Sequence, residues 1–323
     1  MILYGKEPLK SRLDNTAAKG RLSHALLFSG NKGSGRKTMA RYTAQLFLCE
    51  NKACGNCPTC RNIEKDCHPD VIFVKKSLPD EKYLAAPFRE ILRDTAIRPN
   101  NGELKIYVFE DCDDMPPVLH NTLLKLIEEP LPHLRFIFTA ENISAIPETV
   151  ISRVTEYEVP DADVDECVRA LTDTGVNPDK AAELAELFSG NIGRCRTLIN
   201  ETDKESEAEL AVIDSAKQAA HSLACRDLPG TAAALSQQTN RAAFAETFRI
   251  FSHILRDALA VKNQGEAEYL AKNESKKIAD AYSSEQLLNM LDAAFEIERN
   301  TIYNLNLALT VSYFMSRAFN GKV

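Results

Sequence analysis

Glycines and cations typical of a phosphate-binding loop occur near the start of the chain, but their spacing departs from that of a working loop. Residues 30–38 read Gly-Asn-Lys-Gly-Ser-Gly-Arg-Lys-Thr. An ATPase loop needs Gly-x-x-x-x-Gly-Lys-Ser/Thr, because backbone N–H groups surround the phosphates, the lysine reaches the outer ones and the hydroxyl binds Mg²⁺. Counted from Gly30 and Gly35, Arg36 takes the lysine position and Lys37 takes the hydroxyl position, where an ammonium group cannot bind a cation.

The second possible register of the loop fails at its glycines. Counted back from Lys37 and Thr38, the two glycine positions fall on Asn31 and Arg36, whose side chains crowd the approach of the backbone to phosphate. We therefore predict a degenerate nucleotide site that includes Gly33 with the residues above and does not bind ATP tightly. A plain tight turn between a strand and a helix is the alternative.

Two acids follow a later apolar run and could belong to the same site. Glu110 and Asp111 come directly after the run from Lys105 to Phe109, the position of acids that hold Mg²⁺ and orient water in nucleotide hydrolysis. Such sites usually have Asp before Glu. The reversed order here retracts the second carboxylate by about one C–C bond, a misplacement that can cost ~100-fold in rate. Solvated acids at the end of a strand are the alternative.

Four closely spaced cysteines predict a metal site. They occur as C-x4-C-x2-C-x2-C, so that two overlapping C-x-x-C turns can direct sulfur atoms toward one centre, and they are Cys49, Cys54, Cys57 and Cys60. Four protein ligands leave no open coordination position, which predicts a structural Zn²⁺ in a module of residues 49–60. A redox C-x-x-C pair or four free thiols are the alternatives.

Composition and charge limit the class of protein. The 323 residues carry a net charge of −7, which argues against a protein that coats nucleic acid, although Lys32, Arg36, Lys37 and Arg41 form a local basic cluster. That cluster is either a contact for phosphate backbones or a solvated helix face. Neither an apolar run of roughly 20 residues nor a signal-peptide pattern occurs, so we expect a cytoplasmic protein without membrane contacts.

The first half of the sequence alternates between strand and helix patterns, which predicts a parallel sheet covered by helices. The predicted strands are Ala25 to Phe28, Val71 to Val74, Lys105 to Phe109, Arg135 to Thr139 and Thr155 to Val159. The predicted helices are Pro8 to Ala18, Lys37 to Cys49, Pro87 to Thr95 and Val118 to Glu128. We assign residues 1–159 to this α/β domain.

The rest of the chain is predicted to be helical. Residues 160–203 contain short capped helices and form a small second domain. Residues 204–323 have helical periodicity, with an apolar stripe at spacings of four, three and four formed by Phe244, Phe248, Phe251 and Leu255. Ser283 and Gln286 are spaced as a capping box for a further helix. Such a bundle can also pack against neighbouring subunits.

The order of motifs resembles one family, the clamp-loader ATPases of the AAA+ class, and within it the delta-prime branch of the bacterial DNA polymerase III holoenzyme. The resemblance rests on the loop, the four cysteines and several short segments. These segments are residues 22–30, His68-Pro69-Asp70, Asn121 to Pro130, Ser152-Arg153 and Gly190 to Arg194. The resemblance implies a P-loop-type α/β domain, a helical lid domain and a helical collar domain.

The resemblance also implies functional residues and partners. In the family, the arginine of a Ser-Arg-Cys triplet enters the ATP site of a neighbouring subunit, and here Ser152 and Arg153 match it while Val154 replaces the cysteine. A surface ion pair of Arg153 with an acid such as Glu156 is the alternative role. Arg194 matches a sensor arginine of the nucleotide site. The implied partners are the gamma/tau ATPase and delta subunits in a hetero-pentamer, with the sliding clamp and primed DNA reached through the complex.

The sequence therefore leaves three candidate functions. The favoured one is a non-hydrolysing structural subunit that is not itself an enzyme, since delta-prime subunits generally lack working ATP loops. The alternative is an active clamp-loader ATPase of the gamma/tau type, which would use Lys37, Thr38, Glu110 and Asp111. A zinc-dependent DNA-binding module that works alone is a third possibility, which the acidic balance opposes.

Overall fold

The structure is a computed structural model that describes residues 2–75, 85–200, 204–265, 267, 271–300 and 306–320. Contacts between Cα atoms divide the chain into two units. Unit 1 contains Met1–Thr174 and Ser189–Gly193, and unit 2 contains Gly175–Phe188 and Arg194–Val323. The predicted lid segment, residues 160–203, is thus shared between the two units, and its predicted end at residue 203 lies outside the described residues.

Unit 1 is built on a five-stranded sheet in the order β2-β3-β4-β1-β5. All four strand pairs are parallel. The strands are β1 (Ala25–Ser29), β2 (Val71–Val74), β3 (Lys105–Phe109), β4 (Leu134–Ala140) and β5 (Thr155–Glu158). Because every strand runs in the same direction, the loops that follow β1, β3 and β4 meet at one edge of the sheet.

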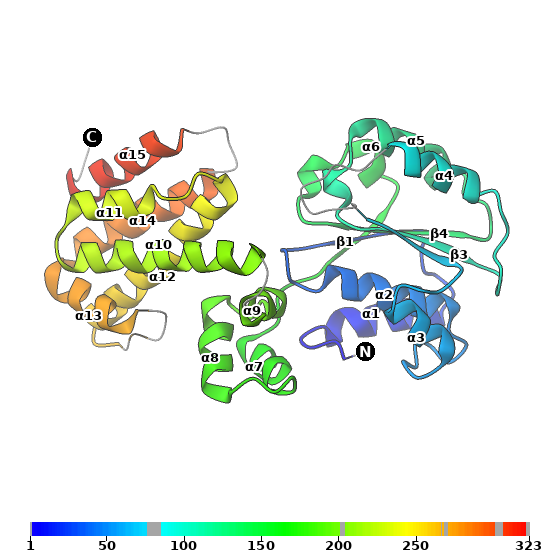
Figure 1. Cartoon of the computed structure of the whole chain (residues 1–323), viewed down its shortest axis with the longest axis horizontal. Helices are drawn as coiled ribbons and strands as arrows, with labels where there is room; N and C mark the ends of the chain where they lie inside the picture. Colours follow the sequence, from blue (N-terminus) through cyan, green and yellow to red (C-terminus); the bar gives the residue numbers. More distant parts are fainter. Residues whose placement is uncertain are drawn as a thin grey trace. The chain divides into compact units, whose positions relative to one another are not determined.

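Helices cover both faces of the sheet, as Figure 1 shows. On one face lie α1 (Glu7–Ala18), α2 (Arg36–Leu48) and α3 (Pro58–Glu64). On the other lie α4 (Ala85–Asp94), α5 (Pro117–Glu128) and α6 (Glu148–Ile151). Two short 3₁₀ turns, Cys112–Asp114 and Ile143–Ala145, follow β3 and β4, and α7 (Val164–Thr172) follows the sheet.

The strand side chains alternate between two cores. Leu26 and Phe28 of β1 pack with the helices α1 to α3, whereas Ala25 and Leu27 pack with α4 to α6. Strands buried on both faces have continuous apolar sequences, which is why these segments could be recognised without an alternating pattern. The prediction of a parallel sheet covered by helices is confirmed, and α2 begins one residue earlier than predicted. The short helices α3 and α6 were not predicted.

Among its described residues, unit 2 consists of helices joined by short loops. The longest helix of this unit, α12 (Arg241–Lys262), packs against α10, α13 and α14. The helices are α8 (Pro178–Leu187), α9 (Ile192–Ile199, which begins in unit 1), α10 (Lys204–Ala224), α11 (Leu228–Leu235), α12 (Arg241–Lys262), α13 (Lys272–Ala281), α14 (Ser284–Asn300) and α15 (Leu307–Asn320). None of the helices in the described part of the chain is long and apolar enough to cross a membrane.

The predicted apolar stripe of Phe244, Phe248, Phe251 and Leu255 forms the centre of unit 2. All its side chains are fully buried, and the rings of Phe248 and Phe251 lie 5.5 and 6.0 Å from the ring of Phe314 on α15. The predicted capping box at α14 is confirmed, because Gln286 N donates to Ser283 Oγ and Ser283 N donates to Gln286 Oε1. The C-terminal region is therefore a helical assembly with its own core.

A buried carboxylate connects β2 to the loop that precedes β3. Asp70 is 1% exposed, and its Oδ1 accepts hydrogen bonds from Asn100 N at 2.6 Å and from Asn100 Nδ2 at 3.1 Å. Its Oδ2 accepts from Asn101 N at 2.8 Å. Asp70 belongs to the His68-Pro69-Asp70 segment that supported the family resemblance. Its hydrogen bonds give that segment a structural role, because they attach the end of the segment to the loop before β3.

Replacing Asp70 with alanine should lower the free energy of unfolding by about 2–3 kcal/mol, because three hydrogen bonds to a buried charged acceptor are lost. Urea unfolding followed by circular dichroism measures the change. Glu103→Ala removes an exposed carboxylate from the same loop and should change the stability by less than about 0.5 kcal/mol. Equal stabilities for the two variants would contradict the assignment.

Candidate functional site

The glycine-rich segment forms a loop between β1 and α2. Gly30 has φ 151°, and a Cβ atom there would lie 2.4 Å from the carbonyl oxygen of Val159, so the chain passes too close for any side chain. Gly35 has φ 100° and is the N-cap residue of α2. The loop thus has the backbone setting of a phosphate loop, with a helix N-terminus directed at its centre.

The two acids after β3 are held by a lysine of the loop. Lys37 Nζ lies 2.7 Å from Asp111 Oδ2 and 3.1 Å from Glu110 Oε2, and the Glu110 side chain is buried. Burial alone would lower the pKa of Lys37, but hydrogen bonds to Asp111 and the charge of Glu110 outweigh it and raise the pKa. The side chain is therefore a firmly protonated ammonium, and a metal ion could reach these carboxylates only by displacing it.

The arginine before this lysine is also directed at the strand ends. Arg36 is 5% exposed, and its Nη2 lies 3.6 Å from Asp111 Oδ1 and 3.9 Å from Glu141 Oε2. One turn along α2, Arg41 Nη2 lies 2.8 Å from Asp66 and 3.2 Å from Glu110. Arg36, Lys37 and Arg41 of the predicted basic cluster are thus paired with carboxylates of their own unit.

A second glycine-containing segment supports the loop from outside. Gly193 N donates to the carbonyl oxygen of Gly33 at 3.1 Å, and Asn191 Nδ2 donates to that of Lys32 at 2.8 Å. Asn191 Nδ2 also lies 2.8 Å from Asp161 Oδ1, and Asn31 Nδ2 donates to the other oxygen of the same carboxylate. These supporting residues were not found from the sequence, where Gly190 to Arg194 was only a motif of unknown contact.

The predicted sensor arginine has its partners in unit 2. Arg194 Nη2 lies 2.6 Å from Glu209 Oε2 on α10, and its Nη1 lies 2.6 Å from Glu246 Oε1 on α12. The guanidinium also stacks over the Phe188 ring, 4.4 Å from its centroid. Burial lowers the pKa of Arg194, but the two glutamates outweigh burial and raise it. Within its unit, this arginine joins the helices through a buried charge network.

The predicted finger residue is exposed near the end of α6. The Arg153 side chain is 39% exposed, and its Nε lies 2.6 Å from Glu128 Oε1 at the end of α5. Its Nη1 donates to the carbonyl oxygen of Thr149 and to Ser152 Oγ. Arg153 thus makes a surface ion pair, as the alternative from the sequence expected, but its partner is Glu128. Glu156 accepts a hydrogen bond from Ser29 Oγ.

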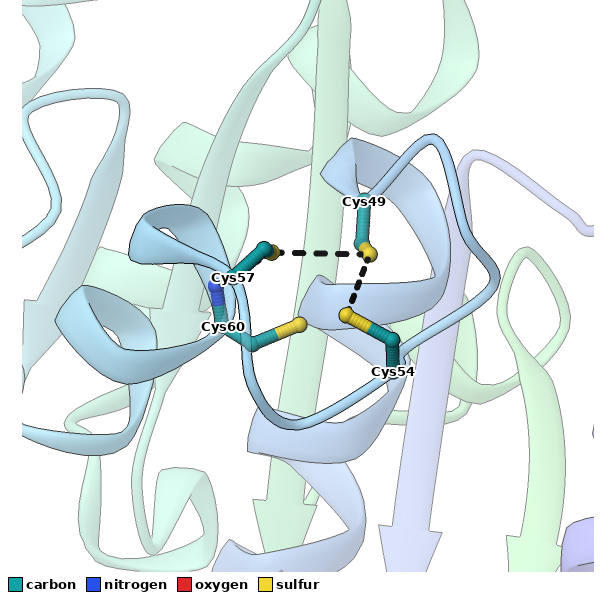
Figure 2. Close-up of side chains that lie close together, drawn as sticks. All are labelled: Cys49, Cys54, Cys57 and Cys60. Atoms are coloured by element: carbon teal, nitrogen blue, oxygen red, sulfur yellow. Dashed lines mark hydrogen bonds between the residues drawn. The ribbon is translucent and has the colours of Figure 1, made fainter.

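The four cysteines of the predicted metal site lie together between α2 and α3 (Figure 2). Their sulfur atoms all lie within 4.8 Å of one another. Cys49 Sγ is 3.7 Å from both Cys54 Sγ and Cys57 Sγ. Gln45 of α2 donates to the carbonyl oxygen of Cys60 at 3.1 Å, which attaches the cysteine turn to the helix.

The cluster geometry fits a tetrahedral zinc ion. Zinc–sulfur bonds of about 2.3 Å in a tetrahedron place the sulfur atoms about 3.8 Å apart, close to the observed separations. Backbone hydrogen bonds from Asn56 and Cys57 lower the pKa of Cys54 to about 6, whereas burial raises the pKa of Cys60. The four thiols could hold Zn²⁺ with no open position, which suits a structural metal and leaves no place for a substrate.

Comparisons with known proteins agree with the motifs. Residues 5–163 match the family model described as DNA polymerase III, delta subunit. The chain is 29% identical over 202 residues to DNA polymerase III subunit delta' of Bacillus subtilis, which covers 61% of this chain and 60% of that protein. It is 30% identical over 168 residues to DNA polymerase III subunit tau of Escherichia coli, which covers 51% of this chain and 26% of that protein.

A third relative extends the comparison to a gamma subunit. The chain is 28% identical over 174 residues to DNA polymerase III subunit gamma of Buchnera aphidicola, which covers 53% of this chain and 46% of that protein. The chain thus spans less than two thirds of the length of each of these relatives. Over residues 5–163, just under half of its length, this chain is therefore similar to the family of DNA polymerase III subunits.

Proposed function

We propose that this chain is a non-hydrolysing structural subunit of the replicative clamp loader, which helps to place the sliding clamp on primed DNA. The observation on which the proposal rests is the pairing of Lys37 with Glu110 and Asp111. In an active site of this type, those two carboxylates would bind Mg²⁺ and orient the attacking water. Here both are paired with one ammonium group that the loop itself supplies, which offsets part of their charge.

The loop side chains support the same conclusion. Arg36 stands at the position of the phosphate-binding lysine, and Lys37 stands at the position of the hydroxyl that would bind Mg²⁺. Thr38, the remaining hydroxyl, is one residue too late for that role. The active ATPase of the gamma/tau type remains the alternative, and it would require Lys37 to release both carboxylates before Mg²⁺ could enter.

The role in the complex is assigned to Arg153, with Ser152 beside it. Its guanidinium is accessible, and contacts with Glu128 and the carbonyl oxygen of Thr149 hold it at the surface. An arginine supplied to another subunit's ATP site stabilises the charge on the transferring phosphoryl group and is worth roughly 10³ to 10⁵ in rate. The Glu128 carboxylate keeps the side chain ordered until a more negative partner replaces it.

The remaining parts of the proposal concern assembly. The cysteine cluster holds a structural Zn²⁺, and the helical C-terminal region serves as a collar in a hetero-pentamer with the gamma/tau ATPase and delta subunits. The domain limits at residues 159 and 203 belong to this proposal, as does a cytoplasmic location. The nucleotide-type residues, from Gly30 to Thr38 with Glu110, Asp111 and Arg194, have structural roles in it.

Purified alone, the chain should neither hydrolyse ATP nor bind a fluorescent ATP analogue more tightly when Mg²⁺ is added. The double variant Arg36→Lys with Lys37→Thr restores the Gly-x-x-x-x-Gly-Lys-Thr spacing and removes the Lys37 ammonium from both carboxylates. Its affinity for the analogue should rise at least about 10-fold on addition of Mg²⁺, because the metal regains its ligands. Mg²⁺-dependent binding with turnover by the unmodified chain would refute the proposal.

Arg153→Ala should leave the chain folded, because the side chain is exposed, and should depress ATP turnover in the complex reconstituted with the other subunits. The site that receives the arginine should lose roughly 10³-fold in rate. Arg153→Lys should not restore it, because an ammonium lacks the two-pronged geometry. Arg93→Ala, an exposed arginine on α4, is the matched control. Turnover that is equal in the complexes containing Arg153→Ala and Arg93→Ala would exclude the finger role.

Freshly purified protein should contain one zinc ion per chain by elemental analysis. Cys60→Ser should lose most of the metal and lower the melting temperature by at least ~5 °C, because the cysteine turn between α2 and α3 loses its centre. Cys67→Ser, an exposed cysteine outside the cluster, should keep both metal and stability. Equal zinc contents in the two variants would speak against this metal site.

A further inference from the structure

A groove with charged walls lies within unit 2, between α8 on one side and α10 with the start of α13 on the other. Its volume is about 820 Å³. Clefts of about 300–1,000 Å³ are typical of ligand sites, so the groove is large enough to receive side chains of another molecule. We call it the charged groove.

The wall formed by α8 is acidic. Asp179, Glu183 and Glu186 line the groove at spacings of four and three residues, so they share one face of the helix. The buried residues of α8 are alanines and leucines only, which attach its other face to the protein. All three acids are exposed, and none of their carboxylates makes an ion pair with the described residues of the chain.

The other wall is basic. Lys217 of α10 and Lys272 of α13 line it, and neither ammonium group has an ion pair within the described part of the chain. His221 lies one turn after Lys217, and its Nδ1 is 3.9 Å from Glu274 Oε1. Glu274 offsets part of the charge of this wall, but the two lysines keep theirs.

The two walls have opposite charges that do not pair across the groove. No N–O distance of 4.0 Å or less joins the acids of α8 to Lys217 or Lys272. A ligand that carried only positive charge would be attracted by one wall and repelled by the other. An occupant with basic groups on one side and acidic groups on the other would complement both walls, and such complementarity selects between partners.

The spacing of the acids indicates that this occupant is a helix. Side chains three and four residues apart lie on one face of any α-helix, so a helix alongside α8 can place a lysine or arginine opposite each acid. Its other side would direct Asp or Glu at Lys217 and Lys272. The start of α13 favours a carboxylate there as well, because its N-cap residue Ala271 makes no side-chain hydrogen bond.

We propose that the charged groove binds a helix of another protein, with basic side chains toward α8 and acidic side chains toward Lys217 and Lys272. The contacts join charges that are partly exposed to water, so binding is sensitive to salt and is selected by charge pattern. The groove shares no residue with the glycine-rich loop, the cysteine cluster or Arg153. The inference therefore does not depend on the proposed function.

Fluorescence anisotropy of labelled synthetic peptides, titrated with the full chain, tests the proposal. The probe is an alanine-rich helix of roughly 20 residues, long enough to be helical in water, with lysines at these spacings on one side and glutamates on the other. One comparison peptide has the same composition in scrambled order, and a second contains lysines only. The probe should bind at least about 10-fold more tightly than either, and its Kd should rise several-fold between about 50 and 300 mM NaCl.

Reversal of charge on one wall locates the binding groups. Glu183→Lys with Glu186→Lys should weaken binding of the probe by about 10-fold or more, because attraction becomes repulsion. Both side chains are exposed, so this variant should melt at the temperature of the parent. A peptide with glutamates on both sides should bind this variant more tightly than the parent. The control, Glu207→Lys with Asp214→Lys, makes the same change in net charge at exposed positions of α10 outside the groove and should bind the probe as the parent does.

The inference is overturned if the probe and the scrambled peptide bind equally, or if the groove variant and the control variant have equal affinity for the probe. Binding of the lysine-only peptide as tightly as the probe would also overturn it, because only the acidic face of α8 would then be recognised. Sedimentation equilibrium tests a different occupant. Self-association of the chain that the groove variant abolishes would assign the groove to a second copy of this chain and would contradict the proposal.

Discussion

The ion pairs between Lys37 and the two acids after β3 determine what this glycine-rich loop can do. A parallel sheet brings the ends of β1, β3 and β4 to one edge, so a cation on the first turn of α2 reaches carboxylates that follow β3. The Coulombic attraction is strengthened by the burial of Glu110, whereas Lys37 and Asp111 remain partly exposed to water. The two carboxylates that follow β3 are thus paired with an ammonium group of the same chain.

Helix α2 connects the two chemical features of unit 1. Its first turn carries Arg36 and Lys37 at the loop, and Cys49 follows directly at its C-terminal end. Gln45 holds the cysteine turn through the carbonyl oxygen of Cys60, and Arg41 pairs with Asp66 just beyond α3. A metal bound by the four cysteines would therefore stabilise the same helix that presents the loop cations.

The family relationship and the geometry support each other at different levels. The match over residues 5–163 and the relatives named gamma, tau and delta' show a likeness to DNA polymerase III subunits of more than one kind. The proposal of a non-hydrolysing subunit depends on the side chains of Arg36 and Lys37 in the loop. The exposed Arg153, in contrast, remains available to a neighbouring molecule.

The sequence by itself determined the elements and the local clusters. All five strands were predicted to within one or two residues, because buried strands between turn residues have a local apolar signature. The gathering of Cys49, Cys54, Cys57 and Cys60 followed from their spacing, since all four lie in one short turn. The position of the loop between a strand and a helix was equally local. These features depend only on residues that are close together along the chain.

Only the tertiary structure decided the partners of the charged side chains. The pairing of Lys37 with Glu110, of Arg153 with Glu128 and of Gly193 with Gly33 joins residues far apart in sequence. Such pairs depend on which strands are neighbours in the sheet and on where each loop returns. An apolar run reports that a strand is buried but not which strand lies beside it, so the order β2-β3-β4-β1-β5 and the charge pairs built on it required the folded chain.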